Sequence, residues 1–103
     1  MSPPPGWQNP ISVLAGQVQT GVDARLLLPG RSDLVKTRLD FQRALLQAGR
    51  PRLTPIQVTP NGVIWDGHHA VRAAAELGLA VAVLVVDEEA SPAGPTILQL
   101  PER

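Results

Sequence analysis

The chain contains two histidines, His68 and His69, which are adjacent and directly follow Asp66-Gly67. Imidazole and carboxylate side chains this close together can contact a phosphate or move a proton at neutral pH. The intervening glycine lets a backbone or a phosphate approach closely. β-Rich residues precede this turn and an alanine-rich stretch follows it, which predicts a strand leading into a helix. A helix N-terminus has unpaired N–H groups and a dipole that favours negative charge, so the turn predicts an anion-binding site.

The residues beside this turn indicate how an anion would be held. Arg72 follows His68 by four residues and shares a helix face with it and with Glu76, so we expect Arg72 to neutralise charge on the anion. The alternative is that Arg72 and Glu76 form only a surface ion pair. We expect Asp66 to bind Mg²⁺ beside phosphates or to orient a histidine, and its alternative role is that of a helix N-cap. Adjacent histidines on a helix point about 100° apart, so a separate zinc site is not expected.

Basic residues are concentrated between Arg25 and Arg52, although the net charge of the chain is zero. Such a segment can contact the phosphates of a nucleotide or of a nucleic-acid backbone, or it can be a solvated helix face. Antiparallel pairing of a strand that starts at Pro55 with one that ends at Trp65 would bring the preceding residues to the turn. We therefore expect Arg52, and also Arg31, to share the anion of the turn. The alternative is that both arginines point into solvent.

Local sequence patterns predict the strands and helices that position these residues. Short strands are expected at 11–14 and 25–28. A helix is expected from a cap at Ser32 or Asp33 to Ala48, closed by Gly49 and Pro51. The side of this helix that is expected to be buried carries Leu34, Phe41, Leu45 and Ala48.

The second half of the chain has the clearer patterns. Asn61-Gly62 between two β-rich runs predicts a hairpin of residues 55–59 and 63–65. A helix is expected at 69–77, closed by Gly78, and a buried strand at 81–86. Residues 97–100 are expected to add an edge strand. Together these elements predict an α+β fold, a small mixed sheet packed with helices.

Composition limits the function. The 103 residues suit one domain, expected at 11–103, after a proline-rich lead-in or linker stub at 1–10 that suggests a larger parent chain. Cysteine is absent, which excludes disulfides, thiolate metal sites and cysteine catalysis. Only three residues are aromatic, so a row of stacking aromatics for single-stranded nucleic acid is not expected. No apolar run approaches the roughly 18 residues of a membrane span, so no membrane partner is expected.

The stretch Thr54–Asp87 resembles the core of the ParB/sulfiredoxin superfamily. That core has a Pro-Ile-x-Val strand, a short hairpin, a Gly-x-x-Arg-type turn, an alanine-rich helix and a closing strand. With weaker likeness upstream, the resemblance covers 26–87. In the partition proteins the turn reads Gly-Glu-Arg-Arg-x-Arg-Ala and binds the triphosphate of CTP. Gly67, Arg72 and Ala73 match that turn, whereas the acidic residue and two of the arginines are replaced.

Other branches of the superfamily resemble the turn more closely. His69 matches the histidine of the sulfiredoxin turn, but His68 stands where its catalytic cysteine would be, so sulfinic-acid reduction is excluded. An Asp-Gly-His-His turn is similar to a branch that contains an ADP-dependent serine kinase and ParB-like nucleases. That branch usually has an arginine after the second histidine, where this chain has Ala70.

The resemblance implies a nucleotide-binding domain that performs NTP hydrolysis or phosphoryl transfer on a nucleoside di- or triphosphate, with Mg²⁺. Gly67 would cradle phosphate, His68 and His69 would contact phosphate or transfer protons, and Asp66 would hold the metal or orient a histidine. One alternative is a ParB-like nuclease, such as the C-terminal toxin domain of a secreted bacterial effector, which acts in the cytoplasm and has an immunity-type partner. A second alternative is a binding module without catalysis, as the loss of arginine at Ala70 suggests.

Overall fold

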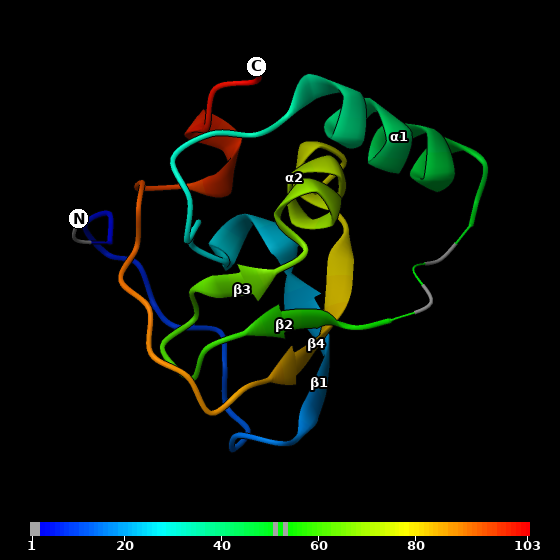
Figure 1. Cartoon of the computed structure of the whole chain (residues 1–103). Coiled ribbons are helices and arrows are strands. Elements are labelled where there is room, and N and C mark those ends of the chain that lie inside the picture. The colour runs from blue at the N-terminus through cyan, green and yellow to red at the C-terminus, as the bar shows by residue number, and fades with distance from the viewer. Residues whose placement is uncertain (1–2, 51, 53) are drawn as a thin grey trace.

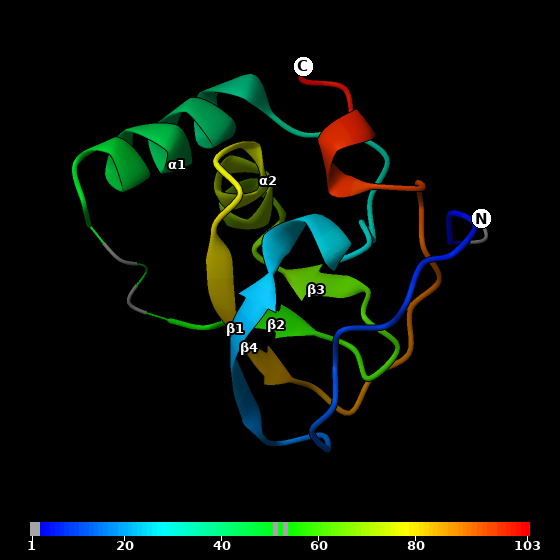
Figure 2. The same ribbon diagram turned by 180° about the vertical axis from the view of Figure 1, so that it is seen from behind.

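A four-stranded mixed sheet and two α-helices make up the fold in the computed structural model, which describes residues 3–50, 52 and 54–103 (Figures 1 and 2). The elements are β1 (Val18–Asp23), η1 (Ala24–Leu26), α1 (Lys36–Gln47), β2 (Ile56–Val58), β3 (Ile64–Asp66), α2 (His68–Glu76), β4 (Ala80–Val85) and η2 (Ile97–Gln99), where η denotes a 3-10 helix. The strand order is β1-β4-β2-β3, with β2 parallel to β4 and the two outer pairs antiparallel. The predicted α+β class is confirmed.

The run from β2 to β4 forms as the sequence predicts. Gly62 closes the hairpin turn with a φ of 82°, and the Thr59 N–H donates to the Val63 carbonyl at 2.9 Å. Helix α2 and strand β4 each lie within one residue of their predicted bounds. This run carries the Asp66–His69 turn, because β3 ends at Asp66 and α2 starts at His68 (Figure 1).

Three predicted strands are wrong. Residues 11–14 form no strand; the first strand is β1, which pairs antiparallel with β4 and was missed because only Val22 in it is buried. Residues 25–28 do not form a strand, because the Asp23 carboxylate accepts the Arg25 N–H at 3.0 Å and starts η1. The edge strand predicted at 97–100 is absent, because Ile97–Gln99 form η2.

Helix α1 begins at Lys36, later than the predicted cap at Ser32 or Asp33. Leu34 is held in an extended bridge with the C-terminal residues: its N–H donates to the Pro101 carbonyl at 2.9 Å. This pairing keeps the preceding residues out of the helix. The predicted inward side is also wrong, because Leu39 is the buried residue of α1 and Phe41 is 61% exposed. Gly49 follows the helix with a φ of 70°, as expected of a helix end, while Pro51 lies outside the described residues.

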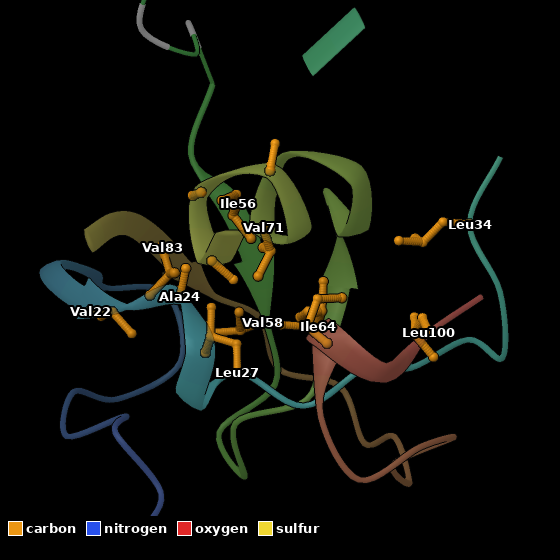
Figure 3. Close-up of a cluster of buried hydrophobic side chains, with 14 of the residues drawn as sticks. Val22, Ala24, Leu27, Leu34, Ile56, Val58, Ile64, Val71, Val83 and Leu100 are labelled. Atoms are coloured by element: carbon orange, nitrogen blue, oxygen red, sulfur yellow. The ribbon is translucent and has the colours of Figure 1, made fainter. Parts of the chain in front are cut away.

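Helix α2 lies between α1 and the sheet, and its inner face forms the middle of an aliphatic core (Figures 1 and 3). The core includes Val22, Leu27, Leu39, Ile56, Val58, Ile64, Val71, Ala74, Val83, Val85 and Ile97. The proline-rich residues expected as a lead-in also contact the domain, since the Trp7 indole N–H donates to the Leu26 carbonyl at 2.8 Å. Both helices in the described part of the chain are too short or too polar to form a membrane span.

Arg72 fastens the C-terminal residues to α2. It is only 9% exposed, and its guanidinium donates to the carbonyls of Ile97 at 3.2 Å and Leu100 at 2.7 Å. Its Nε donates to Glu76 at 3.1 Å, and Glu76 also accepts from Arg43 of α1. Two helices and the C-terminal residues thus share one ionic network.

Replacing Arg72 with methionine is expected to lower the free energy of unfolding by about 2–4 kcal/mol, because two buried carbonyls would lose their donor. Urea denaturation measures this change. The matched control is Arg25→Met, which removes an exposed pair with Asp23 and is expected to cost much less stability than Arg72→Met. Equal losses in the two variants would contradict the structural role of Arg72.

Candidate functional site

A cavity of about 390 Å³ lies at the N-terminus of α2. It is lined by Arg31, Thr37, Arg38, Phe41, Gln42, Arg52, Asp66, Gly67, His68, His69 and Ala70. All of the site residues predicted from the sequence except Arg72 are in this lining. Arg72 points to the C-terminal residues instead, so the structure does not bring it to the turn.

Gly67 is the residue that allows the chain to turn from β3 into α2. Its φ is 103°, a left-handed conformation that favours glycine, and an added Cβ would lie 3.2 Å from the Ile56 side chain. Gly67, not Asp66, is the N-cap, and no side chain caps the helix. Helical geometry leaves the N–H groups of His68, His69 and Ala70 without carbonyl partners inside α2, so these donors are available to an anion.

Both histidines accept a backbone hydrogen bond from the segment that precedes α1. The Gly30 N–H donates to His68 Nε2 at 2.9 Å, and the Val35 N–H donates to His69 Nε2 at 3.0 Å. An Nε2 atom that accepts a hydrogen bond carries no proton, so each imidazole is neutral with its hydrogen on Nδ1. We call these four residues the histidine clasp, because they hold residues 30–35 against the start of α2.

The surroundings keep both histidines neutral. The pKa of His68 is lowered to about 4, chiefly by burial; Arg31 and His69 act in the same direction and Asp66 opposes them. Burial likewise lowers the pKa of His69, with contributions from Arg31 and Arg38. At pH 7 neither ring carries a charge, so the positive charge of the cavity belongs to its arginines.

Gly30 is a site residue whose role was not anticipated from the sequence. A Cβ at this position would lie only 2.6 Å from the Ile64 carbonyl oxygen and 3.5 Å from His68 Nε2. Only glycine therefore lets the backbone reach the imidazole. The Pro29-Gly30 pair marked a turn in the sequence, but nothing local indicated its contact with a residue 38 positions away.

Three arginines from separate segments, Arg31, Arg38 and Arg52, line the cavity together with the carboxylate of Asp66. Arg52 lies 3.7 Å from Asp66 and donates from Nε to the Thr54 carbonyl at 2.8 Å, so the predicted approach of Arg52 to the turn is confirmed. Arg31 also lines the cavity, as expected, beside its pair Asp33 at 3.5 Å. Arg38 of α1 was counted in the basic segment but was not predicted at the site.

Asp66 is the carboxylate that the cavity offers to a metal ion. Among residues 3–50, 52 and 54–103 there is no group of three histidine, cysteine or acidic side chains that could hold a metal. Asp66 is the only carboxylate in the cavity lining, and its side chain is 68% exposed. A metal ion bound at Asp66 would need further ligands from water or from a bound molecule, which Mg²⁺ accepts.

No protein-family model, curated protein or solved structure matches this chain. The resemblance to the ParB/sulfiredoxin superfamily therefore remains a prediction from the residues of Thr54–Asp87.

The clasp predicts that the protein loses stability in mild acid. Because the pKa of His68 is lower in the folded chain than in the unfolded chain, the unfolded chain takes up a proton first as pH falls. The stabilisation is complete above about pH 6.5 and is lost as pH falls towards 4, by up to about 1.4 kcal/mol per pH unit for one such group. Urea denaturation between pH 7 and 5 measures this loss.

The carboxylates titrate in a different pH range. The hydrogen bond from Arg43 lowers the pKa of Glu76, so the stabilisation by that group is lost only below its ordinary range near 4.5. In the double variant His68→Gln/His69→Gln, stability should be independent of pH between 7 and 5. A wild-type protein whose stability is constant over this interval would contradict the neutral clasp.

Proposed function

We propose that this domain binds a nucleoside di- or triphosphate, with its phosphates in the cavity at the N-terminus of α2. The observation that carries this proposal is the convergence of a helix N-terminus with Arg31, Arg38 and Arg52 in one cavity. Backbone N–H groups and guanidinium groups are the donors that phosphate oxygens prefer. Gly67 keeps the approach to these N–H groups free of a side chain, because it has no Cβ.

The histidines have a positioning role in this proposal. A general base needs a free lone pair, whereas Nε2 of both His68 and His69 is occupied by a backbone N–H. A general acid needs an imidazolium, whose formation would break the same hydrogen bond. The neutral rings can still donate from Nδ1 to a phosphate. The clasp therefore supports phosphate contact by the histidines and argues against proton transfer through them.

Phosphoryl transfer remains compatible with this site, because that reaction depends mainly on positioning and charge stabilisation. Asp66 is the carboxylate available in the cavity, either as a ligand of Mg²⁺ or as the acceptor of a proton from an attacking hydroxyl. The arginines would stabilise charge on the transferred group. We propose that the domain hydrolyses or transfers the terminal phosphoryl group of the bound nucleotide.

A nuclease is the second candidate, and Phe41 is the observation that favours it. This ring is 61% exposed and lines the cavity together with three arginines. An aromatic ring beside guanidinium groups is typical of proteins that bind single-stranded nucleic acid. The predictions of a toxin domain and an immunity-type partner depend on this candidate.

Calorimetric titration with ATP, ADP, CTP and GTP in the presence of Mg²⁺ tests nucleotide binding. Arg38→Gln and Arg52→Gln are each expected to weaken the binding of the preferred nucleotide by about tenfold, or about 1.4 kcal/mol. The control Arg25→Gln removes the same charge outside the cavity and should leave the affinity unchanged. Absence of heat with all four nucleotides at millimolar concentration, from folded protein, would contradict the proposal.

Incubation with plasmid DNA and total RNA, with and without divalent metal, separates the two candidates. We expect both nucleic acids to remain intact, because the clasp leaves neither imidazole free for acid–base work. Cleavage that disappears in His68→Ala and His69→Ala would favour the nuclease over nucleotide hydrolysis.

A further inference from the structure

A second cavity, of about 610 Å³, lies between α1, α2 and the adjoining ends of β2 and β4. Its walls are mainly aliphatic, with Leu45 and Leu46 from α1, Ile56 from β2 and Ala74 from α2. The polar residues in its lining are Gln42, Arg50, Arg52 and Thr54. The volume lies within the range of small-molecule sites.

The two cavities adjoin each other. Gln42, Arg52 and Ala70 belong to the lining of both. Along α1, Arg38, Gln42 and Leu46 follow one another at i,i+4 spacing, so a single helix face passes from the arginine-rich cavity to the aliphatic one. The side chain of Ala70 ends at Cβ, so it fills little of the space where they meet.

We propose that the aliphatic cavity receives the nucleoside part of the phosphate ligand and that the two cavities form one binding site. This inference rests on the proposed function, because the phosphates at the N-terminus of α2 direct the rest of the ligand. A nucleobase has two apolar faces and a polar edge. Its faces match the aliphatic walls of the cavity, and its edge could form hydrogen bonds with Gln42 and Thr54. Arg52 lines both cavities and would therefore lie between the base and the phosphates.

The affinities of tripolyphosphate and of nucleotides can be compared to test whether the nucleoside contributes to binding. Inorganic tripolyphosphate carries more negative charge than the triphosphate of ATP, so a site that recognised phosphates alone would bind tripolyphosphate at least as tightly. If the aliphatic cavity holds the nucleoside, ATP or GTP binds at least tenfold more tightly than tripolyphosphate. Calorimetric titration of the full chain with ATP, GTP, ADP, tripolyphosphate and geranyl diphosphate measures these affinities.

Variants of the aliphatic cavity test the placement of the nucleoside. Ala82 is exposed on β4 and lines only this cavity, so Ala82→Leu should remove most of the preference for ATP or GTP and leave tripolyphosphate binding unchanged. Ala70→Leu should have the same effect on the preference, because it narrows the junction between the cavities. Leucine favours helices, and Ala70 is half-buried, so this variant should fold.

The outcomes distinguish the two proposals. Tripolyphosphate binding that equals or exceeds the binding of every nucleotide would overturn the nucleoside site and leave the phosphate site standing. Tighter binding of geranyl diphosphate than of ADP would also overturn it, because the cavity would then hold an aliphatic chain. Failure of tripolyphosphate and all nucleotides to bind would overturn the proposed function itself.

Discussion

The hydrogen bonds of the histidine clasp are the interaction on which the geometry of the cavity depends. Two imidazole Nε2 atoms at the start of α2 accept backbone N–H groups from Gly30 and Val35. These bonds fix the segment that leads into α1, and this segment carries Arg31 to the cavity. They require that Gly30 has no side chain, since a Cβ would meet the Ile64 carbonyl oxygen. They also require neutral rings, which burial and nearby arginines maintain.

The arginines of this chain do two different kinds of work. Arg72 and Arg43 are engaged with carboxylates and carbonyls that join α1, α2 and the C-terminal residues. Their guanidinium N–H groups therefore stabilise the fold. Arg38 and Arg52 instead line a cavity in which Asp66 is the only carboxylate. The positive charge there is not balanced within the lining, and a ligand with several negative charges would balance it.

Local turn chemistry made the run from β2 to β4 predictable, since Asn61-Gly62 fixes the hairpin and the alanine-rich stretch fixes α2. Contacts between distant residues decided the rest. The start of α1 depends on the pairing of Leu34 with Pro101, which no window of sequence contains. The adjacent histidines His68 and His69 could be recognised as candidate site residues from the sequence, so the position of the site was predictable. The role of the pair depends on which atoms accept hydrogen bonds, and Arg72 was misplaced because its carbonyl partners in the C-terminal residues could not be foreseen.

The central claim is that an anion binds to the backbone N–H groups at the start of α2 inside an intact clasp. A ¹H–¹⁵N correlation titration with ATP observes those groups one by one. The account predicts that the largest downfield proton shifts occur at the amides of His68, His69 and Ala70, while the amides of Gly30 and Val35 keep their hydrogen-bonded positions. Shifts concentrated near Arg72 and the C-terminal residues, or the release of the Gly30 and Val35 amides on binding, would contradict the account.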